Sequence, residues 1–246
     1  HEIIVIRRPY YAVDRSVIVY KQVIIKDIKV LRNKHLEAFI HTFLAVLYAR
    51  KVKADIVHIH AVGPALMTPL VRLLGMKAVI THHGPDYDRD KWGKFAKWIL
   101  RMGEKTGMYY ANHIIVISEH IRRMIQQKYP GKKNITLIHN GINPVSPTRS
   151  TEYLQSLDLT EYGYILAVGR LVKEKGFDRL IEAFKQLSPV SIKLVIAGDA
   201  DYQDEYTQKL KEMCKGQKNI CLVGFIKGEK LAQLYTYARI FVLPST

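Results

Sequence analysis

Short apolar strands alternate with amphipathic helices along almost the whole chain of 246 residues, and this alternation limits its fold more than any other feature. The first half predicts strands at 2–7, 17–28 (one or two), 55–60, 77–83, 113–118 and 135–139, with helices at 36–51, 64–75, 90–110 and 119–129. The second half predicts strands at 164–168, 193–198, 220–225 and 240–244, with helices starting at Asp178 and near 202–215. Strands separated by helices form βαβ units, so we expect an α/β protein with parallel sheets covered on both faces.

The apolar pattern disappears between residues 144 and 162, where prolines, serines and threonines gather. We therefore expect a Rossmann-like domain at 1–143, a linker at 144–162 and a second Rossmann-like domain at 163–246, the two facing each other across a cleft. The chain begins with His1 and stops just after the strand at 240–244, where a parallel sheet normally turns into its next helix. The second domain is therefore expected to be partial.

The net charge of +16 is concentrated in the first half of the chain. Residues 1–142 hold 24 Lys and Arg against 10 Asp and Glu, whereas residues 143–246 hold 14 against 12. This asymmetry indicates an anionic partner, such as a membrane surface, a nucleic acid or a phosphorylated substrate, or else a solvated basic surface. Two cysteines, Cys214 and Cys221, are expected to be buried as small hydrophobes, which fits a reducing, cytoplasmic compartment.

Four strand ends carry side chains suited to chemistry. At 169–176, Gly169 and Gly176 let the backbone approach a ligand, while Arg170 and Lys175 suit a diphosphate, and the helix beginning near an Asp178 cap adds its positive end. A solvated turn with lysines for solubility is the alternative. The strand end at Asn140-Gly141 is a turn signal and a possible hinge between the domains.

Histidines mark two other strand ends. His82 and His83 must face opposite ways, so one is expected in the cleft and the other in packing, unless both are structural. His58 and His60 share one strand face, and with His82 or His83 they suggest three nitrogens for zinc. No carboxylate or cysteine supports such a site, so we expect no metal.

Aromatic and basic residues alternate within 88–105. Trp92, Phe95, Ile99 and Met102 fall at helical spacing, which favours core packing, and lysines that include Lys94 and Lys97 are interleaved. The alternative is an interface helix resting on anionic lipid. No apolar run approaches the roughly 18–20 residues that cross a bilayer.

These residues together resemble the GT-B glycosyltransferases, specifically the large retaining family 4. The matching stretches, in the family's order, are DIVHIHAVGPAL, VITHHG, ANHIIVISEHIRRMI, LIHNGINP, ILAVGRLVKEKGFDRLIEAF, LVIAGDAD and VGFIKGEKLAQLYTYARIFVLPST. They cover nearly the whole chain, and VGRLVKEKGFDRLIEAF is the most specific. Residues around HAVGPAL and HHGPDYDRDKWGKFAKW look like a subgroup of bacterial polysaccharide transferases for which rhamnosyl transfer is often proposed.

The resemblance implies roles for particular residues. Arg170 and Lys175 match the cationic pair that neutralises the leaving diphosphate without a metal ion, and His83 matches the catalytic histidine near the donor sugar. Donor-binding positions are Gly169, Gly198, Asn140 and Gly141, and we expect Trp92, Lys94 and Lys97 to face the acceptor or a membrane. Relative to the family, this chain begins partway into the first domain and lacks two glutamates, eight residues apart, that follow the strand at 240–244, so it looks truncated at both ends.

The favoured function is therefore metal-independent, retaining transfer of a hexose or deoxyhexose from a nucleotide-diphospho-sugar to a lipid-linked or polysaccharide acceptor. The truncation makes activity of the chain by itself an open question. We expect no cofactor, no nucleic acid partner and a cytoplasmic location, with contact to anionic membrane at the cytoplasmic face. The alternative is a non-catalytic basic module that binds anionic membrane or nucleic acid. A metal-dependent hydrolase is a weaker rival, and a dinucleotide dehydrogenase weaker still, because no G-x-G-x-x-G occurs.

Overall fold

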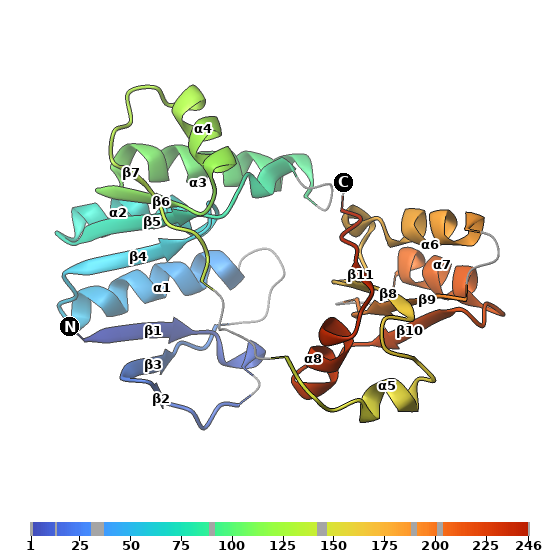
Figure 1. The fold of residues 1–246 in the computed structure, drawn as a ribbon. Coiled ribbons are helices and arrows are strands. Elements are labelled where there is room, and N and C mark those ends of the chain that lie inside the picture. The colour runs from blue at the N-terminus through green and yellow to red at the C-terminus, as the bar shows by residue number, and fades with distance from the viewer. Residues whose placement is uncertain are drawn as a thin grey trace. The chain divides into compact units, whose positions relative to one another are not determined.

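The computed structural model describes residues 2–12, 14–30, 37–88, 92–141, 147–187, 191–200 and 204–245, and it divides the chain into two compact units, His1–Ile142 and Asn143–Thr246 (Figure 1). Each unit contains a four-stranded parallel sheet with helices between successive strands. The predicted α/β class with two Rossmann-like domains is therefore confirmed. Across the described ranges, every helix is too short or too polar to cross a lipid bilayer.

The first unit opens with a small sheet in the order β1-β3-β2, in which β1 (Ile3–Arg7) pairs in parallel with β3 (Val23–Asp27) and β2 (Val19–Tyr20) pairs with β3 in antiparallel fashion. The stretch predicted at 17–28 is therefore two strands. The short helix η1 (Pro9–Tyr11) follows β1, and α1 (Glu37–Lys51) leads to the main sheet.

The main sheet of the first unit has the order β4-β5-β6-β7. Its strands are β4 (Ile56–His60), β5 (Lys77–His82), β6 (His113–Val116) and β7 (Ile135–Leu137). The intervening helices are η2 (Pro64–Met67), α2 (Thr68–Leu73), η3 (Asp86–Asp88), α3 (Lys94–Tyr110) and α4 (Glu119–Lys128). Because all four strands are parallel and in sequence order, their carboxyl ends share one edge, which is where such sheets bind ligands.

Helix α3 packs unusually close to the turn after β4. A Cβ atom on Gly103 would lie 2.2 Å from the backbone oxygen of Val62, and one on Gly107 would lie 2.8 Å from Ile80 Cδ1. These glycines therefore let the helix backbone approach η2 and the sheet. The predicted stripe is divided: Trp92, Ile99 and Met102 are half-buried, whereas Phe95 is 73% exposed, and so is the neighbouring Trp98 at 58%.

The second unit is a sheet in the order β10-β9-β8-β11, with every pair parallel. Its strands are β8 (Tyr164–Val168), β9 (Lys193–Ala197), β10 (Ile220–Gly224) and β11 (Ile240–Phe241). Helices α6 (Phe177–Gln186) and α7 (Glu205–Cys214) cover one face, and α5 (Glu152–Ser156) and α8 (Glu229–Thr236) cover the other (Figure 1).

Side chains of β9 point alternately to the two faces of the sheet, and both sets are buried. Leu194 and Ile196 pack with the side chains of α6 and α7, whereas Val195 and Ala197 pack with Leu154 of α5 and its neighbours. The segment expected to act as a linker, 144–162, thus includes helix α5, whose Leu154 is buried in the second core. Residues 144–146 lie outside the described residues. Cys214 and Cys221 are free and only partly buried.

Candidate active site

Three histidines gather at the carboxyl edge of the first unit's main sheet. His60 ends β4, and its Nδ1 lies 3.2 Å from Nε2 of His83, the residue just after β5. The ring of His58 lies 4.4 Å from that of His60, as expected for one strand face, and its Nε2 lies 2.7 Å from Thr81 Oγ1. The structure thus brings His58 and His60 next to His83, one of the two groupings that the sequence suggested, and gives His83 an imidazole partner.

The two other imidazoles of this group favour their neutral form. Burial lowers the pKa of His58 and His60, and the nearby histidine rings lower both values further. A neutral imidazole has one donor and one acceptor nitrogen, so such a group can hold a hydrogen bond in a fixed direction without adding charge. His83 itself is exposed and can reach a ligand at this edge.

Consecutive histidines His82 and His83 point in opposite directions, as predicted for a strand end. His82 is completely buried, and its Nε2 lies 3.2 Å from Oε1 of Glu104 on α3. His83, by contrast, is on the exposed side with His60. Among the residues that the structure describes, no group of three or more His, Cys, Asp or Glu side chains has a geometry that could hold a metal ion.

Turn 169–176 of the second unit follows β8 at the carboxyl edge of its sheet. The Gly169 N–H donates to the Ala197 carbonyl at 3.0 Å, and the Leu171 N–H donates to the Asp199 carbonyl at 3.1 Å, so the turn is tied to the end of β9. Lys175 lies in the short helix η4 (Lys173–Lys175), and its Nζ donates to Ser245 Oγ at 3.4 Å. Arg170 is exposed at the same turn. The turn thus brings Gly169, Arg170, Lys175 and Gly198 together at one sheet edge.

Two positions of this edge accept glycine alone. Gly198 has a φ of +146°, and a Cβ there would lie 1.8 Å from the backbone oxygen of Gly169. Gly176 has a φ of +63°, and its Cβ would lie 2.5 Å from the oxygen of Pro244. The turn is therefore in close backbone contact with the chain at the ends of β9 and β11. This contact fixes the positions of Arg170 and Lys175.

Helix α6 directs its positive end at this turn. Gly176 is its N-cap, so the prediction that Asp178 caps the helix is wrong. Asp178 instead accepts from Tyr206 Oη at 2.9 Å and from Lys209 Nζ at 3.0 Å, which ties α6 to α7. Among the first amide groups of α6, that of Asp178 donates to Tyr206 Oη at 3.3 Å, so the contribution of α6 to the turn is the positive end of its dipole.

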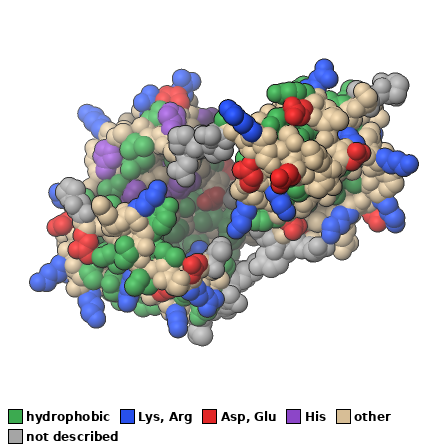
Figure 2. Space-filling model, turned by 60° about the horizontal axis from the view of Figure 1, so that its bottom comes forward, with side chains coloured by type: hydrophobic (Ala, Val, Ile, Leu, Met, Phe, Trp, Pro, Cys, Tyr) green, Lys and Arg blue, Asp and Glu red, His purple; other side chains and the backbone are tan. Residues whose placement is uncertain are grey.

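The remaining candidate residues lie in the first unit. Asn140 and Gly141 are exposed just beyond β7, at the same sheet edge as His83. Trp92 is half-buried ahead of α3, Lys94 is exposed in its first turn, and Lys97 is half-buried. The ten histidines of the sequence all fall within residues 1–142, the range of this unit, and several of them are visible as purple side chains in Figure 2.

The sequence did not mark Glu104 as a functional residue. Its side chain is only 1% exposed and forms a hydrogen bond with His82. A carboxylate in the middle of a helix is normally a surface residue, so nothing local marked it. The only available signal was its position on the helix face that also carries Gly103 and Gly107.

Residues 1–145 match the family described as Glycosyltransferase Family 4, and residues 150–246 match the one described as Glycosyl transferases group 1. An uncharacterized glycosyltransferase of Methanocaldococcus jannaschii is 30% identical over 151 residues, which cover 58% of this chain and 38% of that protein. The amylovoran biosynthesis glycosyltransferase AmsD of Erwinia amylovora is 23% identical over 209 residues, which cover 83% of this chain and 54% of that protein.

A solved structure of Anabaena HepE in complex with UDP-glucose superposes with a TM-score of 0.71 at 17% identity, covering 90% of this chain and 60% of that one. The two Rossmann-like units and this structural match show the GT-B class of fold. The chain belongs to glycosyltransferase family 4, because the match to that family covers more than half of its residues. It spans 38 to 54% of the length of the two curated relatives.

Proposed function

We propose that this protein transfers a sugar from a nucleotide-diphospho-sugar to a lipid-linked or polysaccharide acceptor, with the second unit binding the donor and the first unit the acceptor. Turn 169–176 is the observation that carries the proposal, since it presents Arg170, Lys175 and the start of α6 at one sheet edge. The UDP-glucose in the Anabaena relative and the biosynthetic role named for the Erwinia relative support the donor and acceptor classes. The acceptor class also rests on the resemblance to bacterial polysaccharide transferases.

In the proposed reaction, the bond between the anomeric carbon and the diphosphate oxygen breaks, and an acceptor hydroxyl oxygen forms a bond to that carbon. The hydroxyl proton passes to the departing diphosphate. The new bond forms on the face that the diphosphate leaves, so the configuration is retained. Arg170 and Lys175 neutralise the charge that grows on the leaving group, and the positive end of α6 adds to this effect, so the reaction needs no metal ion. His83 positions the donor sugar through a hydrogen bond.

The test is a donor screen of the full-length protein with chelator present, following release of nucleoside diphosphate. We expect Lys175→Ala and Arg170→Ala each to lower turnover by about 10²-fold while the protein stays folded, because removal of one preorganised donor to a growing charge typically costs that much. Lys185→Ala, at the other end of α6, is the matched control and should retain turnover. Unchanged turnover in both turn variants would contradict the proposed role of the turn.

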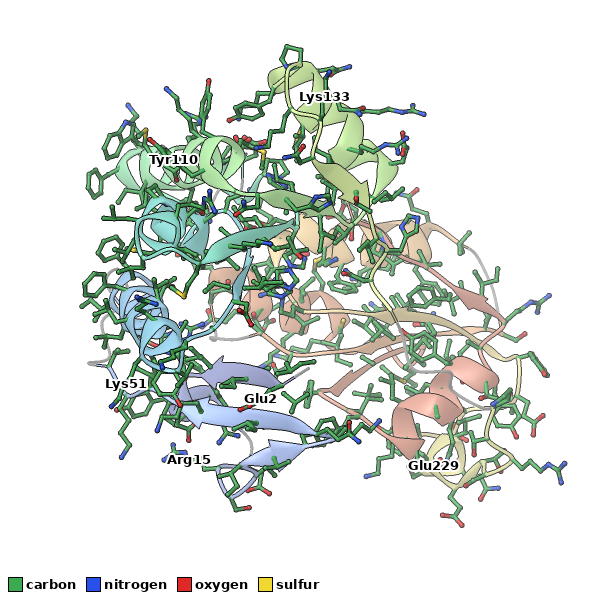
Figure 3. All side chains as sticks on the ribbon, turned by 90° about the vertical axis from the view of Figure 1, so that its left-hand side faces the viewer. Glu2, Arg15, Lys51, Tyr110, Lys133 and Glu229 are labelled. Atoms are coloured by element: carbon green, nitrogen blue, oxygen red, sulfur yellow. The ribbon has the colours of Figure 1, made fainter. Side chains whose placement is uncertain are left out.

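The same protein is proposed to contact anionic membrane through α3 at the cytoplasmic face. Phe95 and Trp98 are exposed on α3 and their rings stack at 6.0 Å, with the basic Lys94 and Arg101 exposed nearby. Tyr109 and Tyr110, 68% and 52% exposed, continue the aromatic surface toward the end of the helix, where Figure 3 labels Tyr110. Aromatic rings with interleaved cations suit the interface of an anionic lipid bilayer. Of the residues predicted to face acceptor or membrane, Lys94 fits this surface better than the half-buried Trp92 and Lys97.

A further inference from the structure

A buried network of charged and polar side chains lies next to the segment that carries His83. Its centre is the carboxylate of Glu104 on α3, to which four side chains donate. Oε1 accepts from His82 Nε2 at 3.2 Å and Tyr87 Oη at 3.1 Å, and Oε2 accepts from Lys128 Nζ and from Tyr129 Oη at 3.3 Å. An ionised carboxylate offers about four acceptor sites, so every one of them is used here.

This network fixes the proton of His82. The Gly84 N–H donates to His82 Nδ1 at 3.1 Å, and a backbone amide can only donate, so Nδ1 carries no proton. Burial acts to raise the pKa of Glu104, but the hydrogen bonds from His82 and Lys128 and the charge of Lys128 lower it to about 2. Glu104 is therefore an acceptor, and Nε2 of His82 carries the single proton of a neutral imidazole.

Residues 83–88 are consequently held at two points. At one, His82 bridges the Glu104 carboxylate to the backbone of Gly84, which has a φ of +124° that glycine adopts readily. At the other, Tyr87 of η3 donates to Glu104 and accepts from Lys128 Nζ at 3.1 Å. His83 directly precedes the first of these points, so its position depends on both.

We propose that Glu104 is a positioning residue for His83, acting through the His82 tautomer and through Tyr87 to set the backbone on which the His83 ring is mounted. The link to catalysis rests on the proposed function, whereas the link between Glu104 and residues 83–88 does not. A buried ionic network of this kind adds little stability compared with apolar packing, but it specifies one geometry when every member is satisfied.

The first test measures Glu104→Gln by amide hydrogen exchange and by the ring nitrogen NMR signals of His82. A glutamine has one carbonyl oxygen, so two of the four donors lose their acceptor, and its NH₂ group faces another donor. We expect at least about tenfold faster exchange at Gly84 and loss of the pure Nε2–H signal pattern, with the exchange of Ile80 within β5 unchanged. Glu119→Gln, which removes a surface carboxylate paired with Arg122 and Arg123 on α4, is the matched control and should change neither readout.

Two results would overturn the proposal: a folded Glu104→Gln protein with wild-type exchange at Gly84, or an unchanged His82 tautomer. If Glu104→Gln does not fold, the double variant Glu104→Gln with Lys128→Met removes the buried carboxylate together with its partly exposed lysine partner and is read in the same way. If the wild-type protein used no nucleotide sugar, the proposed function would be wrong. The exchange and tautomer measurements would still decide whether Glu104 positions residues 83–88.

The second test uses turnover of the full-length protein. Because Glu104 acts through His83, kcat should fall in Glu104→Gln with little change in KM for the donor, and the double variant with His83→Ala should be no slower than His83→Ala alone. Losses that simply add in the double variant would show that Glu104 acts independently of His83, against the proposal.

Discussion

Gly198 illustrates how a single residue positions the second unit's candidate site. It lies at the end of β9, its N–H donates to the Gly224 carbonyl at 2.8 Å, and its α-carbon faces the backbone oxygen of Gly169. The absence of a side chain thus permits the approach that places the turn with Arg170 and Lys175 against the neighbouring strand. The sequence indicated a role at this position only through the family resemblance.

Gly198→Ala should destabilise the second unit by more than about 2 kcal/mol, because the added methyl group would overlap a backbone oxygen and the residue also needs a positive φ. Gly216→Ala is the control. Gly216 has a φ of +75°, but a Cβ there would meet nothing within 4 Å, so the cost should be limited to about 1 kcal/mol of backbone strain. Urea unfolding of both variants gives the comparison, and equal destabilisation would contradict the close approach.

At the scale of elements, α3 shows why helical periodicity alone is ambiguous. The helix has one face packed closely against η2 through Gly103 and Gly107 and another that exposes Phe95 and Trp98. Both faces have small or apolar residues at helical spacing, so the sequence pattern could not say which one lies inward. The face with Gly103 and Gly107 packs inward because these two glycines let the helix backbone come close to η2 and the sheet.

The network that joins β5, η3, α3 and α4 predicts how stability depends on pH. The pKa of Glu104 is lowered to about 2, mainly by His82 and Lys128 against the opposing effect of burial. A lowered pKa contributes stability above the ordinary glutamate value and loses it as the pH falls, so the loss should occur between about pH 4.5 and pH 2. Its size should be on the order of 3 kcal/mol.

Urea unfolding of the first unit as a function of pH measures this contribution. The acid-dependent loss should be much smaller in Glu104→Gln, which cannot titrate, whereas Glu119→Gln should keep it. An identical pH dependence in wild type and Glu104→Gln would mean that other carboxylates dominate acid unfolding.

At the scale of the whole molecule, charge divides the chain as clearly as the contacts do. The +16 net charge belongs almost entirely to residues before 143, and the two compact units separate at Ile142 and Asn143. The unit proposed to meet the acceptor is thus strongly basic, whereas the unit proposed to bind the donor is nearly neutral. Such a distribution favours an anionic surface as the partner of the first unit.

Binding to vesicles that contain anionic phospholipid should therefore be salt-sensitive, and it should weaken at least about tenfold when Phe95 and Trp98 are both replaced by alanine. These side chains are exposed, so the double variant should unfold at the wild-type urea concentration. Cosedimentation with anionic and with zwitterionic vesicles is the measurement. If neither the double substitution nor the salt concentration changed the binding to anionic vesicles, α3 would not be the membrane contact.

The sequence by itself indicated most strands and helices in their order, although not α5, and it indicated the two Rossmann-like units and the opposite directions of His82 and His83. These features depend on local periodicity and on composition, since neighbours two, three or four residues apart share a strand or helix face. The same local pattern marked the turn at 169–176 as a place for an anion.

Only the tertiary structure decided which side chains meet. The pairing of His82 with Glu104 spans 22 residues, and that of Lys175 with Ser245 spans 70. Such contacts arise when parallel strands bring their ends to one edge and a helix packs on the sheet, and no local pattern encodes the partner. For this reason the sequence indicated the chemical groups of the candidate site, whereas packing determined the network that holds them.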